Sequence, residues 1–175
     1  MSIEKSRRDF LGLAFGSVAA IGGVLALGAM KSTWEPIPSV MAAGYTTVDL
    51  STITPGEFKT VVWRGKPIFI LRKDHTKFKK CKNRDTKAGK EDFLVVVGLC
   101  THLGCIPAWE PKKNMFHCAC HGGEYNDCGV NIYGPPPRPF DIPPYKITGT
   151  KMVLGEDGAQ FKKLVSKNPT NIYKG

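Results

Sequence analysis

Two short segments carry residues that could hold a metal centre. The first is 100–105 (CTHLGC) and the second is 118–125 (CACHGGEY). One cysteine and one histidine stand in ligand spacing in each, C-x-H in the first and C-x₂-H in the second. Thiolates suit iron–sulfur clusters and zinc, and imidazole suits either metal. The candidate ligands are therefore Cys100, His102, Cys118 and His121.

The same four residues allow a second chemistry. Two cysteines and two histidines can form a closed, tetrahedral structural zinc site. That interpretation leaves Cys105 and Cys120, one in each segment, without a role. An iron–sulfur cluster is favoured for this reason, and a non-redox zinc module remains the alternative from another function class.

Taken together, the two segments resemble the ligand boxes of Rieske proteins, specifically the disulfide-containing class of bacterial cytochrome bc complexes. The resemblance implies one [2Fe–2S] cluster, with Cys100 and Cys118 on one iron and His102 and His121 on the other. Replacing two thiolates by neutral imidazoles raises the reduction potential. The histidines also keep a titratable nitrogen, so His102 and His121 are the expected sites of coupled proton and electron transfer.

Further positions follow the same resemblance. Cys105 and Cys120 match the family disulfide, which would hold the two ligand loops together in an exported protein. Leu103 resembles the residue that shields the cluster at the quinol site. The run 63–70 (WRGKPIFI) is similar to a run of bc-complex Rieske subunits. A proline loop that covers the cluster is matched by Gly134, Pro135, Pro136 and Pro137.

The second box departs from the family pattern C-P-C-H-G-S-x-Y. Ala119 replaces the proline and Gly123 replaces the serine. The serine hydroxyl normally donates a hydrogen bond to a bridging sulfide, and such donors favour the reduced cluster. We therefore expect a lowered potential that suits a quinol such as menaquinol, and a rise in the midpoint for Gly123→Ser. Tyr125 remains as a possible donor to a ligand sulfur.

Short β-rich runs separated by turn clusters must position these loops. Candidate strands are 46–50, 60–63, 68–72, 93–99, 115–117, 145–148, 151–154 and 160–165. Their spacing favours antiparallel sheets, and the 19 glycines and 13 prolines favour a loop-rich β domain. The expected fold is all-β: a Rieske fold of stacked antiparallel sheets with a small cluster-binding subdomain at about 98–142, preceded by one transmembrane helix.

The N-terminal region reads as an export address and an anchor. Residues 6–11 (SRRDFL) fit the twin-arginine pattern, with Arg7 and Arg8 as its basic pair. The uncharged stretch 10–30 would span about 30 Å as a helix. We favour a retained signal-anchor over a cleaved signal, because 41–44 (MAAG) is only a weak cleavage site. The positive-inside rule then keeps the N-terminus in the cytoplasm.

These features predict four regions. They are a cytoplasmic n-region at 1–9, a transmembrane signal-anchor at 10–30, a neck at 31–44 that is partly extended around its prolines, and a head domain at 45–175. The head would lie in the periplasm of a bacterium, tethered to the inner membrane by a single pass.

The net charge of +10 has one main source. Nine of the 25 Lys and Arg lie in 72–90, against Asp74 and Asp85. No nucleic-acid motif accompanies this block, so we expect no nucleic-acid partner. A solvated insertion is the favoured interpretation, with His75 solvated inside it, and a docking surface for an acidic partner is the alternative. Residues 73–92 have no counterpart in the resemblance.

Three other residues have open roles. Cys81 and Cys128 remain after the ligands and the family disulfide are assigned. They could form a second disulfide, or each could be a buried residue or a free thiol. His117 could pack near the cluster, but no ligand position is left for it.

The resemblance implies the iron–sulfur subunit of a quinol–cytochrome c oxidoreductase. One electron would pass from menaquinol or ubiquinol to the cluster, with a proton to a ligand histidine, and then to a c-type cytochrome. Cytochrome b and a c-type cytochrome would be partners within a dimeric complex. The alternative is the small Rieske subunit of an arsenite-oxidase-like molybdoenzyme, which shares the signal and the cluster but exchanges no electrons with quinol.

Overall fold

The computed structural model describes residues 6–169, 172 and 173. The chain divides into two compact units, Met1–Met41 and Ala42–Gly175, which are described separately below. The second unit holds all of the described strands and both candidate ligand loops.

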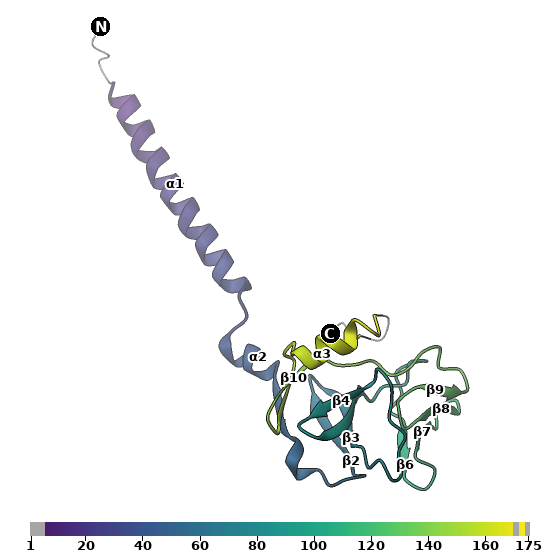
Figure 1. Cartoon of the computed structure of the whole chain (residues 1–175). Coiled ribbons are helices and arrows are strands. Elements are labelled where there is room, and N and C mark those ends of the chain that lie inside the picture. Colours follow the sequence, from purple (N-terminus) through teal and green to yellow (C-terminus); the bar gives the residue numbers. More distant parts are fainter. Residues whose placement is uncertain (1–5, 170–171, 174–175) are drawn as a thin grey trace. The chain divides into compact units, whose positions relative to one another are not determined.

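The first unit is dominated by one long helix, α1 (Arg7–Trp34) (Figure 1). Ser6 caps its N-terminus in a capping box with Asp9, which satisfies amide groups that the first turn leaves free. The 28 residues of α1 extend about 42 Å, and none of them is buried. The helix is long and apolar enough to cross a membrane. It extends beyond the predicted 10–30, and residues 1–5 of the predicted n-region lie outside the described residues.

The predicted extended neck is only partly correct. Glu35, before Pro36, is extended, as the residue before a proline should be. Residues Pro38–Ala43 instead form a short helix, α2. Pro38 stands at its first position, where a proline removes no helical hydrogen bond, and alanines favour the turn that follows.

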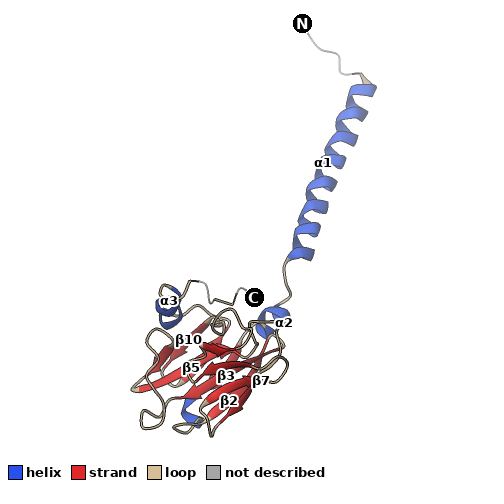
Figure 2. Cartoon of the chain, turned by 90° about the vertical axis from the view of Figure 1, so that its right-hand side faces the viewer, coloured by secondary structure: helices blue, strands red, loops and turns tan. Residues whose placement is uncertain are grey.

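Three antiparallel sheets build the second unit, which confirms the predicted all-β class (Figure 2). The first sheet has the order β1-β11-β10, the second β2-β3-β5-β4 and the third β6-β7-β8-β9. Their bounds are β1 Thr46–Asp49, β2 Phe58–Trp63, β3 Lys66–Arg72, β4 Asp85–Ala88, β5 Glu91–Val97, β6 Ala108–Glu110, β7 Met115–Cys118, β8 Gly123–Asn126, β9 Asn131–Tyr133, β10 Tyr145–Thr148 and β11 Lys151–Leu154. A 3₁₀ turn, Leu50–Thr52, follows β1.

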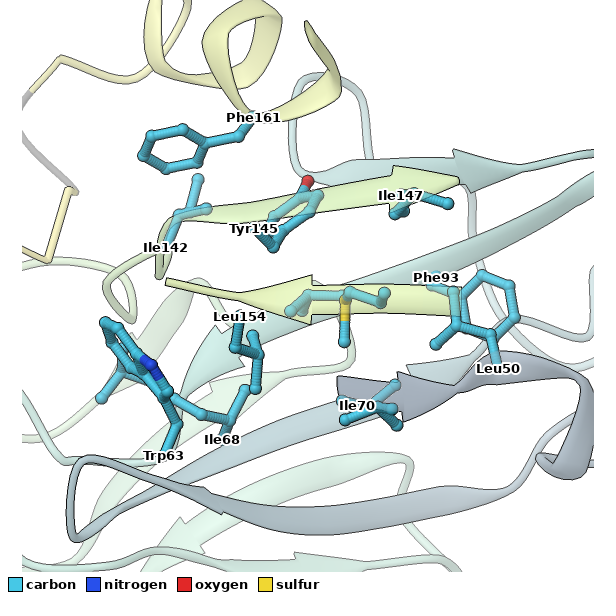
Figure 3. Packing of buried hydrophobic residues seen from close by; sticks show 14 of the residues in the cluster. Leu50, Trp63, Ile68, Ile70, Phe93, Ile142, Tyr145, Ile147, Leu154 and Phe161 are labelled. Carbon is cyan, nitrogen blue, oxygen red and sulfur yellow. The ribbon is translucent and has the colours of Figure 1, made fainter. Parts of the chain in front are cut away.

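The central strands β3 and β5 contribute to two cores because both of their faces are buried. One face packs against the first sheet through Ile68, Ile70 and Phe93, opposite Tyr145 and Leu154 (Figure 3). The other face packs against the third sheet, with Phe69, Leu71, Phe78, Leu94, Val96, Phe116, Tyr125 and Phe140 in the second core. Near-continuous apolar runs are typical of strands buried on both faces. The second core supports the ligand loops directly.

One predicted strand is wrong. Residues Ala159–Val165 form a helix, α3, in place of the strand expected at 160–165. Phe161 and Leu164 are its buried residues, and their i, i+3 spacing places them on one helical face. Four short strands, β4, β6, β8 and β9, were not predicted.

The basic block is not a simple solvated insertion. The side chain of Lys73 is fully buried and its Nζ lies 3.0 Å from Asp127 Oδ2. Arg84 is also buried and donates to the carbonyl oxygens of Cys128 and Phe140. His75 is exposed, as expected, and its Nε2 lies 3.0 Å from the buried carboxylate of Asp92.

Asp85 in this block should make stability depend on pH. Burial raises the pKa of Asp85 to about 6, above the value of about 4 in an unfolded chain. The stability that its neutral form contributes is therefore complete below pH 4 and is lost as the pH rises through 6. Asp85→Asn should stabilise the protein at pH 8 by on the order of 1 kcal/mol, allowing for partial exposure, as measured by denaturant unfolding of the holoprotein.

A matched control is Asp74→Asn, a few residues earlier in the same block. Hydrogen bonds from Thr76 lower the pKa of Asp74, so any stability that this carboxylate adds is lost as the pH falls. The two variants should thus deviate from wild type in opposite directions at pH 8. Parallel curves for wild type and Asp85→Asn between pH 4 and 8 would contradict this assignment.

Candidate metal centre

The two ligand loops are held by the strands beside them. The first loop, Cys100–Cys105, is separated from the end of strand β5 by two residues. The second connects β7, which ends at Cys118, to β8, which begins at Gly123. Both strands of this hairpin belong to the third sheet, at one end of the head (Figure 1).

Each loop makes the same turn. Gly104 N donates to Cys100 O at 2.8 Å, and Gly122 N donates to Cys118 O at 3.0 Å. Both glycines, four residues after a candidate ligand, have positive φ, +83° and +69°, a conformation that glycine adopts without strain. A further bond from Cys100 N to Cys105 O, at 2.7 Å, closes the first loop. The same turn therefore follows Cys100 and Cys118, while the candidate histidine stands two residues after the first cysteine and three after the second.

The predicted ligands form an inner and an outer pair. Cys100 and Cys118 are buried and are the free cysteines among the described residues. His102 is half-buried and His121 is exposed. The two imidazole rings meet edge to face, with centroids 4.7 Å apart. Two buried thiols beside two less buried imidazoles supply the donor set that a [2Fe–2S] cluster with mixed cysteine and histidine ligands would require.

Their surroundings are consistent with a bound cation. His102 Nδ1 is buried and has no hydrogen-bond partner among the described residues, an arrangement that is costly unless a ligand satisfies it. Burial raises the pKa of the Cys118 thiol, while the backbone N–H groups of Cys120 and His121 oppose this rise by favouring the thiolate. A metal centre would stabilise that thiolate.

The four predicted ligands are not gathered around one point. Among the described residues, their donor atoms do not all lie within 4.8 Å of one another. Cys105, Cys118 and Cys120 do, but two of these sulfurs are joined in a disulfide. Four donors around one ion, as in a mononuclear zinc site, are therefore not seen among the described residues.

Tyr125 contacts an inner ligand as the sequence suggested. Its hydroxyl donates to Cys100 Sγ at 3.4 Å. Burial, the largest cause, raises the pKa of Tyr125 to about 12, so the hydroxyl keeps its proton at neutral pH. Phe140 stacks on the ring with centroids 3.8 Å apart, which fixes the orientation of this donor.

Two disulfides flank the site. Cys105 and Cys120 are bonded, with Cα atoms 6.7 Å apart, and they connect the two ligand loops. Cys81 and Cys128 form a second disulfide, with Cα atoms 5.5 Å apart. The sequence left this second pair undecided. It attaches the basic block to the third sheet just before β9.

The proline loop packs directly on the second ligand loop. Gly134 has φ +83°, and a Cβ there would lie 2.9 Å from Gly122 O. A Cβ on Gly123 would lie 2.6 Å from Pro136 Cγ. Pro136 is buried, whereas Pro135 and Pro137 are exposed. The ring of Pro136 therefore occupies the space that a side chain at position 123 would fill.

Sequence reasoning missed Thr101, which lies between the first two ligands. Its backbone N donates to Tyr125 Oη at 2.9 Å, and its hydroxyl donates to Arg138 O at 2.6 Å. Arg138 in turn pairs with Asp141. The signal that could have identified Thr101 was a polar residue between Cys100 and His102. These bonds join the first ligand loop to the segment that follows the proline loop.

Two other residues, Leu103 and His117, were also predicted to lie near the site. Leu103 is exposed at the tip of the first loop, with 73% of its surface accessible. His117 lies on β7 with its Nδ1 3.5 Å from Glu110 Oε1, so it pairs with a carboxylate.

Comparison with known proteins gives a consistent assignment. The model of the Rieske [2Fe-2S] domain matches residues 44–150. The chain is 40% identical over 166 residues to the ubiquinol-cytochrome c reductase iron-sulfur subunit of Bradyrhizobium diazoefficiens, covering 86% of this chain and 94% of that protein. The corresponding subunit of Rickettsia prowazekii is 36% identical over 164 residues, covering 86% and 93%.

A solved structure is similar as well. A chain of a structure described as a hyperthermophilic respiratory Complex III is 40% identical, with a TM-score of 0.58. The match covers 81% of this chain and 98% of that one. The domain match spans both ligand loops and every strand from β1 to β10. The chain belongs to the Rieske family, and its cofactor is one [2Fe–2S] cluster.

Proposed function

We propose that this chain is the electron-carrying subunit of a quinol–cytochrome c oxidoreductase, with its cluster held by Cys100, Cys118, His102 and His121. The observation that carries the proposal is the gathering of two buried thiols and two outward imidazoles at one end of the head. Relatives named as ubiquinol-cytochrome c reductase iron-sulfur subunits support it over most of both chains.

When bound, a [2Fe–2S] cluster takes up and releases one electron at a time. The residues around it supply the rest. His121 is exposed, so its free ring nitrogen is the better placed of the two to accept a proton from a quinol hydroxyl and release it to water. Leu103 at the exposed tip offers an apolar contact for the quinol site. Pro136 packs on Gly123 and would exclude water from the side of the cluster that is held by the two buried cysteines.

The N-terminal segment would attach this head to a membrane. We propose that α1 is a retained anchor in the bacterial inner membrane, exported through Arg7 and Arg8, with the head in the periplasm. Residues 31–44 would act as the neck of a head at 45–175, whose cluster-binding part is about 98–142. A tether keeps the head at high local concentration near both electron partners, which we infer to be cytochrome b and a c-type cytochrome in a dimeric complex.

Purification of the complex from native membranes tests the proposal. Stopped-flow mixing with menaquinol or ubiquinol should reduce the cluster and then the c-type haem, followed by EPR and by haem absorbance. Failure of both quinols to reduce the cluster would contradict it. Co-purification with a molybdenum-containing large subunit would support the molybdoenzyme alternative, which is not favoured by relatives named as reductase subunits.

Gly123 provides a test of how the chain sets its potential. A Cβ there would lie 3.8 Å from Cys100 Sγ, so a serine hydroxyl could reach the centre, but only if Pro136 moves. Gly123→Ser should raise the midpoint potential because its hydroxyl favours the reduced form, by about 40 mV for each kcal/mol of differential stabilisation. Redox titration followed by EPR measures the shift.

Gly123→Ala is the matched control, since it displaces Pro136 equally without adding a donor. The difference between the two variants isolates the hydroxyl from the displacement of the loop. Equal shifts in both would show that the proline contact, and not the missing donor, sets the potential.

A further inference from the structure

A group of exposed lysines lies on the flank of the third sheet. The connection from β3 to β4 contributes Lys77, Lys79, Lys80 and Lys82, and the turn between β6 and β7 contributes Lys112 and Lys113; all six are exposed. We call these six residues the basic flank. Lys77, Lys79 and Lys113 line one hollow of about 320 Å³, so the two segments meet in space.

The basic flank is built on a fixed base. The disulfide Cys81–Cys128 attaches its centre to the third sheet. At one end of the flank, the buried side chain of Lys73 forms a salt bridge with Asp127. At the other end, buried Arg84 donates a hydrogen bond to Cys128 O. These restraints hold the lysines in place relative to the ligand loops, unlike those of a mobile charged loop.

Most of its charge is not neutralised within the chain. Lys113 pairs with Glu110 at 2.8 Å, and Lys80 lies 4.0 Å from Asp92. Among the described residues, the other four lysines of the flank form no salt bridge within 4.0 Å: Lys77, Lys79, Lys82 and Lys112. Four like charges on a fixed surface attract an acidic partner over several ångströms.

The basic flank adjoins two exposed apolar residues of β9, Ile132 and Tyr133. Ile132 lines the same hollow as Lys77 and Lys79. Ile132 and Tyr133 are 53% and 69% exposed, and the chain runs directly from them into the proline loop. An apolar patch with a charged rim is typical of a protein–protein interface. Complementary charge at such a rim mainly accelerates association and sets orientation.

We propose that the basic flank docks on an acidic surface of the c-type haem subunit that takes the electron. This inference rests on the proposed function and names how one of its partners is recognised. A quinol site within a membrane subunit would be apolar, and burying unpaired lysines there would be costly. The water-facing acceptor is the partner that these charges fit.

The test uses the purified complex carrying Lys77→Glu, Lys79→Glu and Lys82→Glu together. The matched control reverses Lys87, Lys90 and Lys151, three exposed lysines outside the flank. Lys87 lies on β4, Lys90 in the turn between β4 and β5, and Lys151 at the start of β11. At low ionic strength, electron transfer from the cluster to the c-type haem should fall about tenfold or more in the first variant and stay near wild type in the control. Reduction of the cluster by quinol should be unchanged in both.

A second readout does not depend on electron transfer. Carbodiimide treatment of the wild-type complex should join Lys77, Lys79 or Lys82 to carboxylates of the c-type subunit, and salt should suppress these cross-links. Equal rates and no such cross-links, in a complex whose haem is still reduced by quinol, would overturn the inference while leaving the proposed function intact. A defect that appears only in vesicles rich in anionic lipid would assign the flank to the membrane and overturn it too.

Discussion

Replacing His121 with alanine should abolish the Rieske-type EPR signal and lower quinol-driven haem reduction by on the order of 100-fold or more. Without His121 the cluster would lose one of its two proposed imidazole ligands, and the exposed position of His121 would let water take its place. Cys118→Ser should have the same result, because a buried hydroxyl is a much poorer ligand for iron than a thiolate. EPR of the reduced protein and iron content measure both.

His117→Ala is the matched control for His121→Ala. His117 lies four residues earlier in the same hairpin, but its Nδ1 faces Glu110 rather than the ligand group. The control should keep the EPR signal, the iron content and the rate of the wild type. Loss of the signal in His117→Ala, with retention in His121→Ala, would show that the ligand assignment in the second loop is wrong.

Removing the Cys81–Cys128 disulfide should have the largest effect on stability. The bond closes a segment with a sequence separation of 47. Loop-closure entropy in the unfolded chain then predicts a loss of about 4 kcal/mol for Cys81→Ala with Cys128→Ala. Denaturant unfolding of the holoprotein measures this loss, and the EPR spectrum and midpoint potential should change little because both cysteines stand outside the ligand loops 100–105 and 118–125.

The Cys105–Cys120 pair provides the matched comparison. Its sequence separation is only 15, so the predicted entropic loss is smaller, about 3 kcal/mol. Its removal should nevertheless destabilise the cluster, because this bond alone joins the two ligand loops covalently. A Cys81→Ala/Cys128→Ala variant that lost its cluster, beside a Cys105→Ala/Cys120→Ala variant that kept it, would reverse the roles we assign to the two disulfides.

The sequence predicted those parts of the fold whose local signals agree with their environment. Strands β10 and β11 lie at the predicted residues because apolar alternation and a Gly-containing turn mark them. β3 and β5 were found through their apolar runs. The candidate ligands were found because cysteine and histidine at such spacing have few other uses.

The unpredicted parts depend on tertiary contacts. Strand β9 has one half-buried and two exposed residues, and Tyr125 is the one large apolar side chain of β8 (GEYN), so neither shows apolar alternation in the sequence. The segment of α3 contains residues compatible with either structure, and packing on the core selects the helix. Lys73 and Arg84 were taken for solvated charges, since only the fold brings Asp127 and the carbonyl of Cys128 to them.

Iron and sulfide analysis with pulsed EPR of the dithionite-reduced, full-length protein tests the central claim most directly. We predict two irons and two sulfides per chain, and magnetic coupling to two histidine nitrogens that disappears in His102→Ala and His121→Ala. One zinc per chain without sulfide, or a cluster with no histidine nitrogen coupling, would contradict the assignment of Cys100, His102, Cys118 and His121 as its ligands.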